Sequence, residues 1–270
     1  MSTNPNLVTM SNMLTRAAYS LSLSEKRLLM LAVTRIDNSS DDSQILTISP
    51  SEYANFYTLN HTGVYRTLKR AVENLWTRTL VADDNTKYRW IITSRYENGV
   101  IELEFHPRLK PHLVQLKNQF TQYFLHRAAD FKLLYTWRLF ELIMQFKSTG
   151  YLKIDLDDLK KAMDVPTAYD RDFGLVRSKV IAPAIAEIKE KDGLKITWKP
   201  IKTGRKVTAL EFKFPREQQT ALPLSPLPDK TTHNPSTSTA EAQAEKAHME
   251  KLAAMSGVPL DTLMGKEKTQ

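Results

Sequence analysis

The sequence predicts an α+β fold in which one structural unit occurs twice, about 106 residues apart. An amphipathic helix, a short strand followed by an acidic helix start, a second amphipathic helix and a hairpin ending in Leu-Glu-Phe follow in this order in both halves. Helix, strand, helix and hairpin are the plan of a winged helix, so the repeat predicts two tandem winged-helix domains. Beyond residue 216 the chain is rich in Pro, Ser and Thr and lacks hydrophobic periodicity, which predicts a disordered C-terminal tail.

In the first unit the helix, strand, helix and hairpin are predicted at residues 21–36, 46–48, 63–75 and 90–105. Ser24 is the expected N-cap of the first helix, with Arg27 at the third helical position instead of the Glu of a capping box. Ser49 or Ser51 is expected to cap the short helix after the strand. Asn98-Gly99 is a typical two-residue hairpin turn and predicts the tip of the first wing.

In the second unit the same elements are predicted at residues 131–146, 152–154, 173–188 and 194–212. Between the units, apolar residues at 113, 116, 120, 123 and 124 are compatible with a connecting helix. Residues 1–12 lack periodicity and are expected to form a flexible arm. The predicted organisation is therefore an arm over 1–12, a first domain over 13–118 with a connecting helix to 125, a second domain over 126–216, and a tail over 217–270 with a weakly indicated short helix at 240–255.

Composition limits the classes of function. The 270 residues suffice for two domains with cores of their own, and the absence of Cys excludes disulfides and thiolate metal sites. No apolar run approaches the roughly 18 residues of a membrane span, and the first eight residues are too polar for a signal peptide. Net charges of +3 for residues 1–118, +7 for 119–216 and −2 for 217–270 indicate that the second domain has the stronger attraction to a phosphate backbone, although a solvated basic surface would give the same count.

The candidate DNA-binding residues lie opposite the apolar stripes of the two second helices and at the second wing. Pro183 should kink the second of these helices, so the side on which Arg177 lies is not fixed by a straight helical wheel. The wing tip at residues 199–206 is basic, as a phosphate-straddling hairpin requires, although a solvated turn would look similar. The candidates are Arg66, Lys69 and Arg70 in the first domain, and Arg171, Arg177, Ser178, Lys179, Lys202, Arg205 and Lys206 in the second.

Several blocks of the sequence resemble one family. Residues 14–22, Glu25-Lys26-Arg27-Leu28-Leu29, residues 118–123, residues 137–142 and residues 180–188 are similar, in the same order, to the iteron-binding plasmid replication initiators, the Rep_3 family that includes the F plasmid initiator. The similarity spans roughly residues 13–215. It departs from the family where Arg177-Ser178-Lys179 replaces a longer basic run, and the tail beyond Arg216 has no counterpart.

The resemblance implies monomers that bind directly repeated iterons at a plasmid origin, and dimers that repress the initiator's own promoter at an inverted repeat. It also implies that the second domain supplies the main major-groove helix, that the first mediates dimerisation and contacts DNA in the monomer, and that the host replicative helicase and host initiator are recruited. The expected location is the bacterial cytoplasm, without membrane contact. A plain winged-helix transcriptional repressor is the alternative.

No catalytic constellation is expected. The six histidines include no His-x-His pair of a metal-dependent nickase, and the one Gly-Lys, at residues 265–266, lacks the first Gly of a phosphate-binding loop. Asp155, Asp157 and Asp158 could hold Mg²⁺ in principle, but they directly precede a predicted helix, where carboxylates favour the helix N-terminus. We therefore expect no enzyme activity, no cofactor and no metal.

Overall fold

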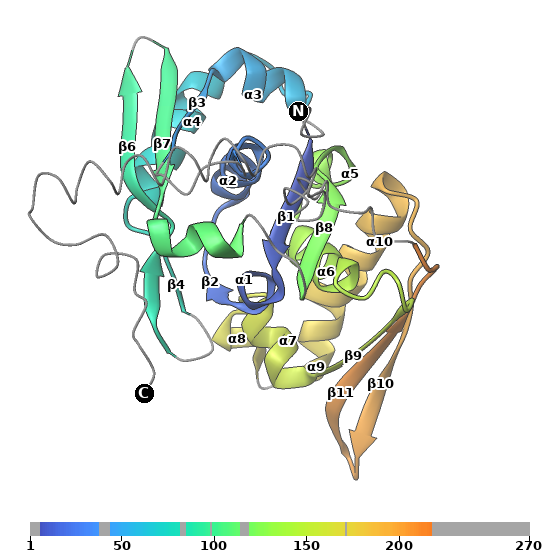
Figure 1. Cartoon of the computed structure of the whole chain (residues 1–270). Helices are drawn as coiled ribbons and strands as arrows, with labels where there is room; N and C mark the ends of the chain where they lie inside the picture. The colour runs from blue at the N-terminus through green and yellow to red at the C-terminus, as the bar shows by residue number, and fades with distance from the viewer. Residues whose placement is uncertain are drawn as a thin grey trace, which may run out of the picture. The chain divides into compact units, whose positions relative to one another are not determined.

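The computed structural model describes residues 6–37, 44–81, 85–97, 99–113, 119–170 and 172–217. All of these lie within one compact unit, residues 1–220. Two helix-and-hairpin modules follow one another in this unit, the first coloured blue to green and the second green to orange in Figure 1. Buried apolar side chains of both modules belong to one core cluster.

The first module has the order of elements that the sequence predicts. Its elements are α1 (Asn12–Arg16), β2 (Ala18–Tyr19), α2 (Leu23–Val33), β3 (Ile45–Ile48), α3 (Pro50–Phe56), α4 (Val64–Leu75), β4 (Thr79–Val81), β5 (Lys87–Arg89), β6 (Ile91–Glu97), β7 (Val100–Phe105) and the 3-10 helix η1 (Pro107–His112). One antiparallel sheet has the order β3-β7-β6, and another has the order β2-β4-β5. Leu46 pairs with Leu103 and Ile48 with Ile101, and all four side chains are buried beneath the sheet.

The start of α2 differs from the prediction. Its N-cap is Ser22, not Ser24: the Ser22 hydroxyl accepts a hydrogen bond from the backbone N–H of Glu25 at 3.3 Å. The Glu25 carboxylate in turn accepts from the Ser22 N–H at 3.0 Å, which completes a capping box. Only Ser22 has a Glu three residues later, so the reciprocal pair decides between the two serines. Ser49 caps α3, as one of the two serines expected there.

The predicted flexible arm and connecting helix are both wrong where the structure describes them. Residues Leu7–Ser11 form strand β1, and residues Phe120–Phe124 form strand β8, which pairs with β1 antiparallel from Leu7↔Phe124 to Ser11↔Phe120. Val8, Met10 and Tyr123 are buried, so both strands are fixed by burial as well as by hydrogen bonding. Residues 1–5 and 114–118 lie outside the described part of the chain.

The second module repeats the plan with a longer wing. Its elements are α5 (His126–Ala129), α6 (Leu134–Met144), β9 (Tyr151–Asp155), α7 (Leu156–Ala162), α8 (Thr167–Asp170), α9 (Phe173–Val176), the π-helical segment η2 (Arg177–Ile181), α10 (Ala182–Lys191), β10 (Thr197–Thr203) and β11 (Lys206–Lys213). The sheet order is β10-β11-β9, so Pro200 lies on an edge strand, where a missing N–H is tolerated. Figure 1 shows the β10–β11 hairpin extending beyond the helices of its module.

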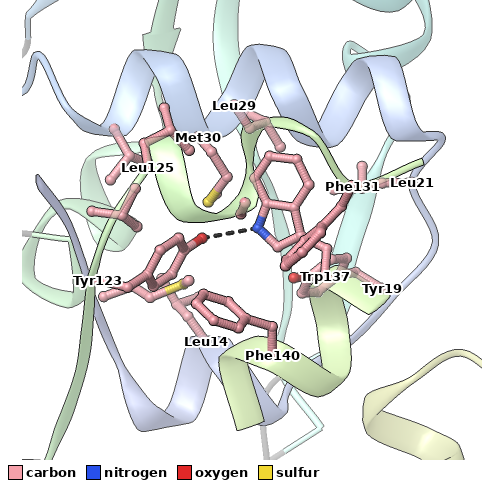
Figure 2. Packing of buried hydrophobic residues seen from close by; sticks show 14 of the residues in the cluster. Leu14, Tyr19, Leu21, Leu29, Met30, Tyr123, Leu125, Phe131, Trp137 and Phe140 are labelled. Carbon is pink, nitrogen blue, oxygen red and sulfur yellow. Dashed lines mark hydrogen bonds between the residues drawn. The ribbon is translucent and has the colours of Figure 1, made fainter. Parts of the chain in front are cut away.

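A buried polar network joins the two modules. Lys26 of α2 lies 2.7 Å from Glu141 of α6, and both side chains are fully buried. The Tyr123 hydroxyl donates to Glu141 at 2.8 Å and accepts from the Trp137 indole N–H at 2.9 Å, the contact dashed in Figure 2. Burial lowers the pKa of Lys26, and Glu141 opposes this shift. Lys26 also donates to the Tyr19 hydroxyl at 3.0 Å, so each charged group has a partner.

Arg138 of α6 extends this junction. Its side chain is fully buried and donates to the backbone carbonyl of Ala17 at 2.9 Å and to that of Ala162. The guanidinium also lies 3.6 Å from the centre of the Tyr19 ring. Because one side chain from α6 binds backbone atoms of both modules, α6 acts as their common support.

The C-terminal segment of the described chain is fastened to the second module. The backbone of Phe214 bonds to Gly150 at 3.0 Å, and the Glu217 N–H donates to the Lys147 carbonyl at 2.7 Å. Gly150 has φ +68°, and a Cβ there would lie 2.6 Å from the Phe214 carbonyl oxygen, so only glycine fits. Glu217 therefore belongs to the second module, one residue beyond the expected boundary. Residues 218–270, including the helix suggested at 240–255, lie outside the described residues.

Candidate nucleic-acid interface

Helix α4 presents one cationic face in the first module. Its apolar stripe, Val64, Leu68, Ala71, Val72 and Leu75, is buried as expected from its spacing. On the opposite side the predicted contacts Arg66, Lys69 and Arg70 are exposed. Their outward orientation is confirmed, whereas their contact with DNA stays a prediction.

An aromatic pair that the sequence analysis did not single out connects α4 to the first wing. Tyr65 is 54% exposed, and its ring packs edge-to-face on that of Tyr96 of β6 at 4.7 Å. Tyr65 precedes Arg66 in the same helical turn, so the pair fixes the wing beside the cationic face. An exposed Tyr among charged residues was the only signal for it in the sequence.

In the second module α9, η2 and α10 form one irregular helix. After the role in DNA binding that the sequence predicts for them, α4 is called the first recognition helix and this irregular helix the second. Val176, Val180, Ile181, Ala184 and Ile188 are buried, and Arg177, Ser178 and Lys179 are all exposed. The irregularity resolves the position of Arg177: the N–H of Ala182 bonds to the carbonyl of Arg177, five residues back, which is a π-helical bond. Arg171 lies outside the described residues.

The second wing carries the remaining predicted contacts. Lys202, Arg205 and Lys206 flank the turn of the β10–β11 hairpin and are all exposed. Lys199, at the base of the same hairpin, instead pairs with Glu211 at 3.0 Å, and this contact raises the pKa of Lys199. The cations available for a ligand are thus concentrated at the tip of the wing.

No ion pair within the described part of the chain involves any of the predicted contacts. This holds for the following side chains: Arg66, Lys69, Arg70, Arg177, Lys179, Lys202, Arg205 and Lys206. An unpaired exposed cation can neutralise a phosphate without first losing an intramolecular partner. These side chains therefore have the charge and exposure that binding to a nucleic-acid backbone requires.

The first wing differs in this respect. Arg95 of β6 forms ion pairs with Glu97 on the same strand and with Glu102 across the hairpin. Glu104 on the same strand as Glu102 accepts a hydrogen bond from Thr93. The first hairpin thus places carboxylates around its cation, which weakens its attraction to phosphate.

The acidic residues considered for a metal site lie at the start of α7. Asp155 is the N-cap residue, and Asp157 and Asp158 fall in the first helical turn. Within the described residues no three His, Asp or Glu side chains are grouped so that they could hold a metal ion. No helix in this same part of the chain is long and apolar enough to cross a membrane.

Two winged helices in tandem, with outward cationic helices and one unpaired cationic wing, define the class of a DNA-binding protein. The comparisons with known proteins give the family. The model of the N-terminal domain described as "Initiator Replication protein, WH1" matches residues 7–144, and that of the "Initiator Rep protein, WH2" matches residues 155–214. The first match thus includes α5 and α6, which are counted here with the second module because the order of elements repeats from them. The chain therefore belongs to the family of replication initiator proteins with two winged-helix domains.

Individual relatives agree with this family. An Escherichia coli replication initiation protein is 24% identical over 223 residues, covering 77% of this chain and 69% of its own length. An Escherichia coli protein described as an uncharacterized 27.6 kDa protein is 27% identical over 206 residues, covering 69% of this chain and 86% of that protein. The crystal structure of the Pi initiator protein in complex with iteron DNA matches with a TM-score of 0.69 at 22% identity, covering 81% of this chain and all of that one. This structural likeness supports the tandem winged-helix fold.

Proposed function

We propose that this replication initiator binds iteron repeats at a plasmid origin as a monomer and assembles host replication proteins there. The observation that carries the proposal is the second module, where the exposed residues Arg177 and Lys179 of one helix accompany the unpaired wing cations Lys202, Arg205 and Lys206. A helix of this kind reads base edges in the major groove, and the wing binds the adjacent phosphates. The likeness to an initiator solved with iteron DNA supports the same choice of ligand.

The first module has a secondary role in this proposal. Its helix α4 offers the cations Arg66, Lys69 and Arg70 to neighbouring phosphates, so that both modules together span one repeat. Copies bound on adjacent repeats would strain the flanking A·T-rich duplex, where the base pairs are weaker and open more easily than G·C pairs. The protein would then act by binding alone, without making or breaking a covalent bond.

Three further features come from the family resemblance. Dimers, formed through the first module, would bind an inverted repeat and repress the initiator's own promoter. The bound monomers would recruit the host replicative helicase and the host initiator. Since plasmid DNA lies in the bacterial cytoplasm, the protein would act there.

Footprinting on the DNA that flanks the gene, together with a replication assay, tests the proposal. Purified full-length protein should protect direct repeats about two helical turns in length. A plasmid that carries this DNA and no other origin should replicate only in cells that produce the protein. Protection confined to a single palindrome, with no replication, would favour the transcriptional repressor instead.

The non-enzymatic part has a separate test. With Mg²⁺ and ATP present, purified protein should neither nick supercoiled origin plasmid nor hydrolyse the nucleotide. A nicked circle that forms with this protein, and not with a mock preparation, would overturn binding as the sole activity.

A further inference from the structure

The second recognition helix contains one residue more than a regular α-helix would need. An α-helical turn closes between residues four apart, whereas the bond from the Ala182 N–H to the Arg177 carbonyl closes over five. Residues before this π-turn are therefore rotated by about one residue position, roughly 100°, relative to those after it. The rotation decides which side chains enter the core.

The buried residues show which side of the helix faces the core. Val180, Ala184 and Ile188 follow one another at intervals of four and are fully buried. In an uninterrupted α-helix with this core face, Arg177 would fall in the middle of the face and Val176 at its margin. Instead Val176 is fully buried and Arg177 is exposed, so the π-turn exchanges the two positions.

Sequence and energetics both support this exchange. Pro183 has no N–H, and in an α-helix its ring would collide with the carbonyl of Lys179, so a regular helix is disfavoured here. Burying Arg177 without a partner would cost far more than burying Val176. The proline and the Val176-Arg177 order therefore favour the same π-turn.

The turn also spreads three consecutive side chains across the outer surface. Arg177, Ser178 and Lys179 are all exposed, with Ser178 in the centre and one cation on each side. Gly174 and Ala182, four residues before and after Ser178, are exposed as well and continue the same line with small side chains. A helix with this profile can bring its backbone close to a groove floor while cations reach out on both flanks.

We propose that the π-turn in the second recognition helix is a specificity-determining device: it presents Arg177 and Lys179 to DNA on opposite flanks, with only a small residue between them. The inference rests on the proposed function, because it assigns a role within the same DNA-binding site. Pro183 and Val176 are then positioning residues that never touch DNA. The first module has no such device, since α4 is a continuous α-helix.

The test removes the extra residue without altering charge or core. Deleting Ser178 together with Pro183→Ala should give an uninterrupted α-helix that keeps Val176 buried and moves Lys179 onto the central line. We expect folding to be retained, origin-repeat affinity to fall by roughly tenfold or more, as for one lost base contact, and random-duplex affinity to change less than about threefold. The double variant Ser178→Ala with Pro183→Ala keeps the residue count and lacks the same two side chains, so it is the matched comparison: its loss of affinity for the repeats should be clearly smaller than that of the deletion variant.

A second measurement tests the register without DNA. Because the chain has no Cys, single-cysteine variants are clean accessibility probes. Arg177→Cys should react rapidly with a thiol reagent, and Val176→Cys should be protected. The opposite order of reactivity would overturn the π-turn.

The outcomes separate the two proposals. If the wild-type protein shows no preference for the repeats, the proposed function fails, and the accessibility order still decides the register. If the wild type discriminates and the deletion variant discriminates equally well, the π-turn is not a determinant of specificity.

Discussion

The two modules have the same order of elements, but the cation of the first wing is paired with carboxylates and those at the tip of the second wing are not. In the first wing, Arg95 is paired with Glu97 and Glu102, whereas the tip of the second wing leaves Lys202 and Arg205 unpaired. The first recognition helix is regular, and the second is widened by a π-turn. Local pairing of charges thus adds to the difference in net charge between the modules, and both predict that the second hairpin is the better phosphate binder.

The modules are nevertheless not independent. The Lys26–Glu141 pair and Arg138 connect them through buried contacts between residues more than 100 positions apart. Four of the sequence blocks that carry the family resemblance contain residues of this junction, including Tyr19, Tyr123 and Trp137. The resemblance thus reflects the junction at least as much as the DNA-facing surface.

The largest expected effect comes from breaking this junction. Lys26→Met leaves Glu141 buried without its ion-pair partner, so we expect a loss of about 3–5 kcal/mol in the free energy of unfolding. Chemical denaturation followed by tryptophan fluorescence measures it. Because both modules share the core, unfolding should remain a single transition in the wild type.

The matched control for this change removes both charges. The double variant Lys26→Met with Glu141→Leu should recover most of the stability, because no unpaired charge stays buried. A single variant as stable as the wild type would show that the pair does not hold the junction. Two separate transitions in the wild type would show that the modules are separable.

The second largest effect is expected when the cations of the two recognition helices are removed and the losses of DNA affinity are compared. Changing Arg177 and Lys179 together to Ala should weaken origin binding more than changing Arg66 and Lys69, since a lost base contact is worth about 1–3 kcal/mol and a phosphate contact mainly alters the salt dependence. Titrations at one fixed salt concentration compare the two double variants. Equal losses of affinity would show that the second recognition helix does not contribute more to binding than the first.

Removing the cations of the second wing should have a smaller effect on DNA affinity, and this effect should not depend on the DNA sequence. Changing Lys202, Arg205 and Lys206 to Ala should weaken binding to origin and random duplexes by similar factors and flatten the salt slope by up to about three units. Arg95→Ala in the first wing is the control and should change the slope little, because its charge is already paired. An effect limited to origin DNA, with the slope intact, would mean that the second wing reads bases.

Much of this architecture could be predicted from local sequence patterns. The buried stripe of α4 and the strand at residues 45–48 follow from apolar spacing, which depends only on neighbours along the chain. The capping box at Ser22 is also present in the sequence as Ser-x-x-Glu, whereas Ser24 has no Glu three residues later. Local rules therefore sufficed for these elements.

Other features depend on partners far away in the chain. Strand β8 has Thr121, Gln122 and Tyr123 all buried, so it lacks the alternation of a half-exposed strand, and its apolar spacing resembled a helix. Its partner β1 lies more than 100 residues earlier. The outward position of Arg177 likewise required knowing where the helix departs from 3.6 residues per turn, which Pro183 indicated without fixing the phase.

The smallest expected effect concerns the C-terminal end, and it sharpens the boundary of the second module. Glu217 pairs with Arg127 at 2.7 Å, and Arg127 also pairs with Asp192 just after the end of the second recognition helix. A chain that ends at Glu217 keeps this link, and the removed segment is acidic on balance with little apolar content.

Removal of residues 218–270 should therefore leave iteron affinity nearly unchanged. A chain that ends at Arg216 is the matched comparison: it loses the Arg127–Glu217 pair, which is partly exposed, and should lose at most about 1 kcal/mol of stability. Binding titration and thermal unfolding of both truncated proteins measure these effects, and plasmid replication is scored separately because the tail could bind a host factor without touching DNA. A large loss of affinity in the chain ending at Glu217 would show that the DNA-binding unit extends into the tail.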